Sequence, residues 1–99
     1  MLKVTYRNKT IMKVCTNYSY AVKTYGPRMA ELIHLRIDQL ESADSLETMV
    51  KYSIGRCHPL TGNRKGQYAL DLVHPYRIIA NQDKTNLQIV QIIEITDYH

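Results

Sequence analysis

The spacing of apolar residues changes near the middle of this chain, and that change constrains its fold more than any other feature. Between residues 11 and 40, apolar side chains recur every three or four positions, which is the period of an amphipathic helix. Between residues 67 and 72 the large apolar residues Tyr68, Leu70 and Leu72 alternate with Gln67, Ala69 and Asp71, which is the period of a half-buried strand. A helical first part followed by a strand-rich second part predicts an α+β fold.

Local signals set the bounds of the predicted elements. A short alternating stretch predicts a first strand over residues 2–6. Helices are expected over residues 8–24 and 27–42 and are separated by Gly26-Pro27, because Gly commonly ends a helix and Pro suits the first turn of the next. Ser45 is placed to cap a short turn that carries Leu46 and Met49.

Four strands are expected in the second part of the chain. Their predicted ranges are 56–60, 67–72, 76–80 and 87–95. A hairpin loop over 61–66, marked by two glycines, and a polar loop over 81–86 separate them. The expected order is therefore β-α-α-β-β-β-β, a helical hairpin packed on a small, mostly antiparallel sheet. A length of 99 residues suits a single domain, 1–99, with one core.

Composition limits where such a protein works. Cys15 and Cys57 fit no metal-binding spacing, so each is expected to be a buried or half-buried thiol in a reducing compartment. No apolar run approaches the ~20 residues that cross a membrane, and the N-terminal segment lacks the apolar core of a signal peptide. We therefore expect a cytoplasmic protein without membrane contact, and no pattern predicts a metal or nucleotide cofactor.

The formal charge of the chain gathers in one segment. Residues 51–77 carry five basic side chains and one acid, whereas the basic and acidic side chains of the remaining sequence cancel. A basic segment that also holds two histidines predicts a polyanionic partner. Arg56, Arg64 and Lys65 are candidates for positioning phosphates of RNA, with a solvated hairpin tip as the alternative.

Three stretches of sequence carry a resemblance to a known family. The hairpin and the strands around it read HPLTGNRKGQYALDLVHPYRI, and the chain ends in Asp97-Tyr98-His99. Together they resemble the HigB branch of the RelE/ParE-like toxins, a group also labelled plasmid maintenance system killer. The stretch AVKTYGPRMAELIHLRIDQL is similar to the helical hairpin of that group, so the resemblance covers nearly the whole chain.

The resemblance implies the toxin of a type II toxin–antitoxin pair. Such a toxin binds the ribosome and cuts mRNA during translation as an endoribonuclease that needs no metal. The implied partner is a helix-turn-helix antitoxin of the HigA kind, through which alone the toxin would reach operator DNA. The residues implied to form the active surface are His58, Arg77, Asp97, Tyr98 and His99. At two positions the resemblance implies a Lys and an Arg, where this chain has Thr61 and Val73. These differences remove two positive charges from the implied phosphate site.

Cleavage through the 2′-hydroxyl of RNA needs a base, a cation for the phosphorane and an acid. Arg77 suits the cationic role, because its fixed guanidinium fork meets two phosphoryl oxygens; a structural salt bridge to Asp71 or Glu94 is the alternative. His99 is a candidate for proton transfer near neutral pH. His58 is a candidate for the second such group, or is a packed histidine bonded to the backbone.

The remaining candidate residues also have two interpretations each. Tyr98 stacks on a base or orients the phosphate, or else forms an edge of the core. Asp97 orients the imidazole of His99, or else is only solvated. His34 and His74 are expected to be structural.

Two rival functions stay open at this stage. One is a ParE-like toxin that poisons DNA gyrase by binding, and the other is a catalytically weak module that acts mainly as an antitoxin-bound co-repressor. The Tyr-His terminus argues against the first, because a pure binder does not need a proton donor at its end. No helix-turn-helix spacing follows the second predicted helix, so the chain does not read as an antitoxin.

Overall fold

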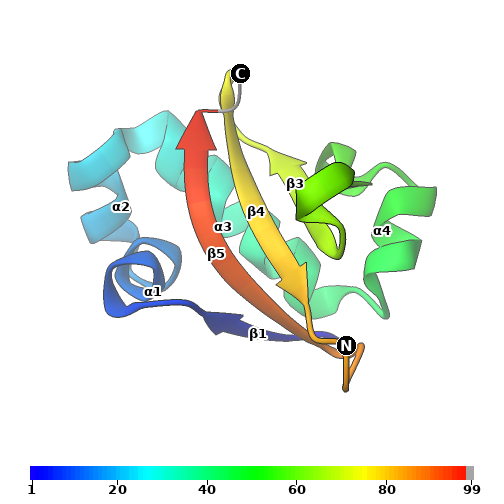
Figure 1. The fold of residues 1–99 in the computed structure, drawn as a ribbon. Helices are drawn as coiled ribbons and strands as arrows, with labels where there is room; N and C mark the ends of the chain where they lie inside the picture. The colour runs from blue at the N-terminus through cyan, green and yellow to red at the C-terminus, as the bar shows by residue number, and fades with distance from the viewer. Residues whose placement is uncertain (98–99) are drawn as a thin grey trace.

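The computed structural model describes residues 1–97 as a layer of helices on a five-stranded sheet (Figure 1). The helices are α1 (Lys9–Thr16), α2 (Tyr18–Tyr25), α3 (Pro27–Ser42) and α4 (Leu46–Lys51). The strands are β1 (Lys3–Tyr6), β2 (His58–Pro59), β3 (Gln67–Asp71), β4 (Tyr76–Gln82) and β5 (Ile89–Asp97). Two short 3-10 turns, η1 (Ile54–Arg56) and η2 (Gly62–Arg64), lie on either side of β2.

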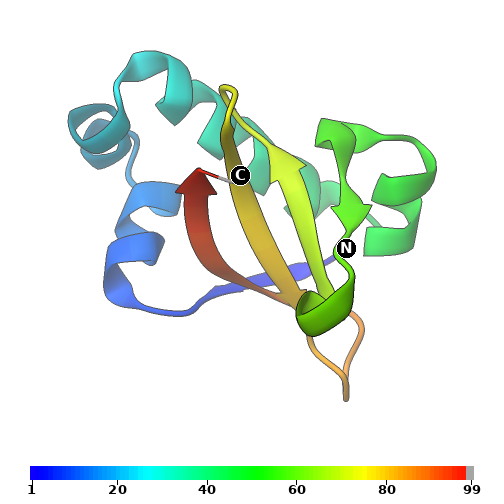
Figure 2. The same ribbon diagram turned by 45° about the horizontal axis from the view of Figure 1, so that its top comes forward.

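The strands are ordered β1-β5-β4-β3-β2 across the sheet. β1 runs parallel to β5, and every other neighbouring pair is antiparallel. Figure 2 shows β5, β4 and β3 side by side. The prediction of an α+β fold with a mostly antiparallel sheet is therefore confirmed.

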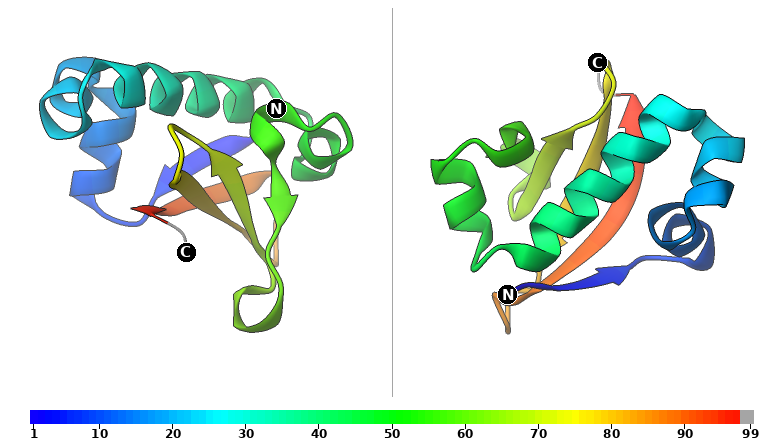
Figure 3. Two further views of the ribbon diagram at one scale, coloured as in Figure 1. Left: turned by 90° about the horizontal axis from the view of Figure 1, so that it is seen from above. Right: turned by 180° about the vertical axis from the view of Figure 1, so that it is seen from behind.

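Helix α3 lies across one face of the sheet and supplies much of the core (Figure 3). Its residues Ile33, Ile37 and Leu40 are buried together with Leu70 and Ile78 of the sheet. Full burial of each such side chain stabilises the fold by roughly 1.5–3 kcal/mol. The predicted helix over 27–42 matches α3, because the stripe of apolar residues and the Pro at its start are both local signals.

The opposite face of the sheet carries charged and polar residues beside the buried Ala69 and Ile79, and we call it the open face. Side chains alternate along a strand, and directly paired residues of neighbouring strands share a face. The residues that precede and follow Leu70 and Ile78 in sequence therefore point away from α3. Pairs on this face are Asp71–Arg77, Ile79–Glu94 and His58–Ala69. The open face thus presents a row of charged and polar side chains from four of the strands.

The single helix predicted over 8–24 is wrong, because the chain breaks at Asn17. The backbone of Asn17 is extended (φ −119°, ψ 104°), and its N–H donates to the carbonyl of Lys13 to end α1. Its side-chain oxygen then accepts a hydrogen bond from the N–H of Tyr20 and so caps α2. This break shifts the phase of the buried stripe, which leaves Tyr18 exposed and buries Ala21.

The strand predicted over 56–60 is also shorter than expected. β2 has two residues, because the chain before it turns through left-handed backbone at Ser53 (φ 52°), Gly55 (φ 61°) and Arg56 (φ 53°). Pro59 then has no N–H to donate to a longer ladder. The other three strands cover residues 67–71, 76–82 and 89–97 and so lie within two residues of their predicted ends.

The two cysteines are both buried as free thiols. Burial raises the pKa of the Cys15 thiol to about 12 and that of Cys57 to about 11. Neither thiol is therefore ionised near neutral pH, which argues against a nucleophilic role for either.

Among the helices of the described chain, none has the length and apolar character needed to cross a bilayer.

Candidate functional site

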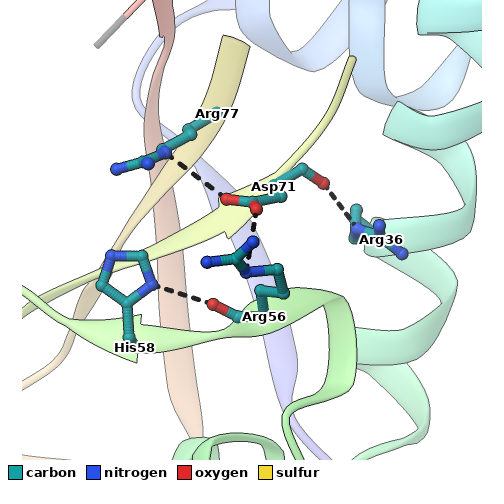
Figure 4. Close-up of polar contacts among 5 residues, drawn as sticks. All are labelled: Arg36, Arg56, His58, Asp71 and Arg77. Atoms are coloured by element: carbon teal, nitrogen blue, oxygen red, sulfur yellow. Dashed lines mark hydrogen bonds and ion pairs between the residues drawn. The ribbon is translucent and has the colours of Figure 1, made fainter. Parts of the chain in front are cut away.

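An ion-paired cluster on the open face brings together three residues from different parts of the basic segment (Figure 4). The carboxylate of Asp71, at the end of β3, lies between two arginines. Its Oδ2 is 3.3 Å from Nε of Arg56, and its Oδ1 is 3.4 Å from Nε of Arg77. The side chains of Asp71 and Arg77 are about three-quarters buried, whereas that of Arg56 is 81% exposed. The pair with Arg77 is therefore the better shielded of the two from solvent.

A third arginine supports this cluster from the helical side. Nε of Arg36, on α3, donates to the backbone carbonyl of Asp71 at 2.7 Å, and its Nη1 donates to Oε1 of Gln39 at 3.1 Å. The Arg36 side chain also passes directly beside Gly55, where an added Cβ would lie 2.8 Å from its Cδ and Nε. Glycine at position 55 thus allows the close approach that holds the end of β3.

The loop that presents Arg56 is strained. Ser53 and Arg56 both have positive φ values although neither is glycine, and Gly55 lies between them with a positive φ as well. Each such non-glycine residue costs roughly 1 kcal/mol or more, and outliers of this kind gather at functional sites. Their position directly before β2 makes this loop part of the candidate site.

His58 on β2 lies next to these arginines, and a contact with the backbone orients its ring. Its Nδ1 lies 2.8 Å from the backbone carbonyl of Arg56. A carbonyl oxygen only accepts, so Nδ1 carries the proton. In a neutral imidazole this leaves Nε2 as an acceptor, which is the form that a general base requires. The backbone hydrogen bond expected for a packed histidine is therefore present, and in the neutral ring it leaves Nε2 able to accept a proton.

A surface cavity of about 370 Å³ lies within this group of residues. It is lined by Ser53, Arg56, Cys57, His58 and Arg77. Two guanidinium groups and one imidazole therefore face a common space, which favours an anionic occupant. The protonated Cys57 contributes a neutral wall.

The predicted site residues at the end of the chain are only partly within the described structure. Asp97 pairs with Tyr76, and Thr96 pairs with Arg77, so β5 ends beside the strand position of Arg77. Register places Asp97 on the face of Tyr76, which packs on the core, and not on the face of Arg77. Tyr98 and His99 lie outside the described residues.

The predicted phosphate-positioning role of Arg64 meets a competing contact. Its guanidinium forms a salt bridge with Glu94 of β5, and its Nε donates to Oε1 of Gln67 at 2.8 Å. Arg64 therefore ties the hairpin loop to the open face. Its neighbour Lys65 is exposed and borders a separate concavity.

The structural role expected for His34 agrees with its contacts. Nε2 of His34 lies 3.1 Å from the carbonyl of Val14, and the ring stacks edge-on against Tyr18 at 5.5 Å. These contacts join α1, α2 and α3 on the helical layer. They lie away from the open face.

Asp71 and Arg36 were not expected as members of the site. Asp71 entered the sequence interpretation only as an alternative partner for Arg77, although it is the one acid in residues 51–77. Arg36 lies on a helix and gave no signal, because its contact with residue 71 depends on the tertiary fold. Within residues 1–97, no three His, Cys, Asp or Glu side chains gather as potential metal ligands.

Solved structures similar to this chain come from toxin–antitoxin systems. A YoeB-YefM complex from Staphylococcus aureus matches with a TM-score of 0.64 at 20% identity, over 100% of this chain and 98% of that chain. A YoeB/ParE toxin from Agrobacterium tumefaciens matches with a TM-score of 0.65 at 16% identity, over 99% of this chain and 100% of that chain. The chain has the YoeB-like fold.

A further YoeB structure agrees with this result. The heterotetrameric complex of the YoeB-YefM toxin-antitoxin from Staphylococcus aureus matches with a TM-score of 0.54 at 19% identity, over 100% of this chain and 98% of that chain. No protein-family model matches the sequence, and no curated protein does so either. At these identities the YoeB likeness is a likeness of fold, and it confirms the predicted architecture.

Proposed function

We propose that this protein is the toxin of a type II toxin–antitoxin pair and acts in the cytoplasm as a ribosome-dependent endoribonuclease that cleaves mRNA during translation. The observation that carries the proposal is the cavity on the open face, where Arg56, His58 and Arg77 converge. Two cations beside a histidine with an acceptor nitrogen suit attack on a phosphodiester. The YoeB-like fold, which this chain shares with structures from toxin–antitoxin systems, supports the toxin part of the proposal.

His58 is proposed as the general base. Its protonated Nδ1 is held by the carbonyl of Arg56, so Nε2 accepts the proton of the 2′-hydroxyl. The 2′-oxygen then attacks phosphorus and forms a pentavalent phosphorane. Collapse of the phosphorane breaks the bond between phosphorus and the 5′-oxygen.

Arg77 is proposed to stabilise the negative charge of the phosphorane. Its Nε lies 3.4 Å from Oδ1 of Asp71, and this ion pair keeps the guanidinium group beside the carboxylate before RNA binds. Such preorganised charge is usually the largest single contribution to catalysis. Arg56, with its largely exposed side chain, is proposed to position a phosphate at the rim.

His99 is proposed as the general acid that protonates the 5′-oxygen, with Tyr98 stacking on a base. The proposal for these two residues comes from the sequence. Supporting it, Thr96 is paired with Arg77, so the chain approaches its end beside the proposed phosphate site. Asp97 remains a proposed partner of His99, although register places it on the face of Tyr76.

An antitoxin is proposed as the protein partner. The support is that YoeB of Staphylococcus aureus has been solved in a toxin-antitoxin complex with YefM. For this chain we propose an antitoxin of the helix-turn-helix, HigA-like kind. Contact with operator DNA would then pass through that partner.

The test is single-turnover cleavage of mRNA on programmed ribosomes, with thermal melting to show that each variant is folded. His58→Ala, Arg77→Ala and His99→Ala are each expected to slow cleavage by about 10²–10⁴-fold. Arg28→Ala is the matched control, because Arg28 is exposed at the start of α3. Its cleavage rate should equal that of the wild type.

Two results would count against this function. Wild-type rates from folded His58→Ala and Arg77→Ala proteins would remove the proposed site. Inhibition of DNA gyrase by the wild type, unchanged in these variants, would favour the ParE-like alternative, in which binding alone poisons the target.

A further inference from the structure

A second concavity, of about 800 Å³, lies beyond the proposed cleavage site. Its lining comes from the hairpin loop between β2 and β3, from Tyr68 of β3 and from Lys84 in the turn between β4 and β5. We call it the hairpin groove. Tyr68 pairs with Ala80, which belongs to the core under the helices, so Tyr68 and Arg77 lie on opposite faces of the sheet.

The chemistry of the hairpin groove is aromatic and cationic. Tyr68 is half-buried and lies beside Pro59 and Leu60, while Lys65 and Lys84 are exposed on the rim. None of the residues that line it is acidic. A tyrosine that packs partly on the core and two exposed lysines give the hairpin groove the kinds of side chain that proteins use to stack a base and neutralise its phosphate.

Arg64 and Asp83, which lie next to these lysines in sequence, have contacts of their own. Arg64 is paired with Glu94 on the open face. The carboxylate of Asp83, next to Lys84, accepts hydrogen bonds from the backbone of Thr85 and Asn86, and it is thereby held in its own turn. The hydrogen bond from the Thr85 hydroxyl, which is the largest cause, and these backbone bonds lower the pKa of Asp83, so its carboxylate keeps a negative charge.

The hairpin groove also adjoins the proposed cleavage site through the edge strand β2. His58 and Pro59 are consecutive, so their side chains point to opposite faces. His58 lines the cleavage cavity and Pro59 lines the hairpin groove. A strand of RNA that passes around this edge would therefore meet both surfaces within a short length.

We propose that the hairpin groove binds a nucleotide of single-stranded RNA that lies outside the cleaved linkage, with Tyr68 stacked on its base and Lys65 and Lys84 on its phosphates. This subsite rests on the proposed ribonuclease function. It gives affinity without taking part in the chemistry, and it makes that affinity dependent on salt.

The experiment measures binding of a fluorescein-labelled, 2′-O-methylated RNA hexamer by anisotropy over a range of salt concentrations. This probe lacks the hydroxyl needed for cleavage. Tyr68→Leu should weaken binding by about tenfold, and Tyr68→Phe, which keeps the ring, should change it by less than about twofold. Lys84→Ala should also reduce the slope of log Kd against log salt by about 0.7, the value for one phosphate contact with a single strand.

Lys23→Ala on the exposed side of α2 serves as the control and should bind as the wild type does. Equal binding by Lys84→Ala, Tyr68→Leu and this control would overturn the subsite, as would a wild-type protein that does not bind the hexamer. Competition by a poly-glutamate peptide as strong as that by RNA would overturn it too, because the hairpin groove would then suit an acidic protein partner.

Cleavage on programmed ribosomes separates failure of the subsite from failure of the proposed function. The variants of the hairpin groove should raise KM and leave kcat near the wild-type value, whereas His58→Ala should lower kcat. If the groove variants have the KM of the wild type and His58→Ala still lowers kcat, the subsite is wrong and the proposed function stands. Normal cleavage by His58→Ala would remove the function, while the binding data would still test the hairpin groove.

Discussion

Gly55 offers a sharp test of how the helical layer supports the candidate site. An alanine at this position would adopt a left-handed backbone (φ +61°) and would place its Cβ 2.8 Å from Cδ and Nε of Arg36. Side-chain rotation relieves such a clash easily. Rotation of Arg36, however, breaks its hydrogen bond to the carbonyl of Asp71.

The expected loss of stability has two parts. Forcing alanine into left-handed backbone costs about 1 kcal/mol. Loss of a hydrogen bond from a charged donor costs about 2 kcal/mol more. For a domain of this size each kcal/mol lowers the melting temperature by about 4–8 °C, so Gly55→Ala should melt roughly 10 °C below a variant that has only the backbone cost.

Gly62→Ala provides that matched variant. Gly62 has nearly the same backbone (φ +65°), and a Cβ there would meet nothing within 4 Å. Thermal melting of the two proteins isolates the contact with Arg36. In an Arg36→Ala background the extra cost of Gly55→Ala should disappear, as a double-mutant cycle would show. Equal melting temperatures for Gly55→Ala and Gly62→Ala would refute the support that we assign to Arg36.

Two other predictions concern charge and pH. Arg64→Ala should lower the melting temperature by a few degrees, because the contact with Glu94 is lost. It should leave the salt dependence of RNA binding unchanged. A weaker dependence of binding on salt would show instead that Arg64 contacts phosphate. Burial raises the pKa of Cys15 from 9.0 to about 12, so the stability that the neutral thiol contributes is complete below pH 9 and is lost as the pH rises toward 12. Urea unfolding at about pH 8 and pH 10.5 should show this loss, and Cys15→Ala should reduce it; the same alkaline loss in that variant would assign the effect to other groups.

The sequence predicted those parts of the fold whose causes are local. Gly26 and Pro27 stand beside each other, so the boundary between α2 and α3 was visible, and Ser45 caps α4 through its hydrogen bond to the N–H of Thr48 as its position indicated. The break at Asn17 was missed, because the apolar spacing continues through it with little change. The short β2 was missed for a different reason, since left-handed backbone at Arg56 is imposed by the tertiary fold.

The residues of the candidate site also differ in whether their causes are local. Charge counting found the segment that holds Arg56 and Arg77, because both residues are close in sequence. It could not find that Arg64 pairs with Glu94, thirty residues away, or that Arg36 reaches the end of β3 from a helix. A basic residue found by composition is therefore a candidate for RNA contact only after its acidic neighbours in the fold are known.

The two sides of the sheet place positions 61 and 73, where the family resemblance implies Lys and Arg, in different surroundings. On the open face, Asp71 lies between Arg56 and Arg77, so that cluster has a net charge of only one. Val73 packs against the core, where a charged side chain would be costly, and Thr61 lines the hairpin groove. Neither Thr61 nor Val73 lines the proposed cleavage cavity, and the hairpin groove holds Lys65 and Lys84 on the other side of β2. In our proposal, RNA affinity thus comes partly from contacts outside the cleaved linkage, while the ion pair with Asp71 keeps Arg77 beside the proposed phosphate site.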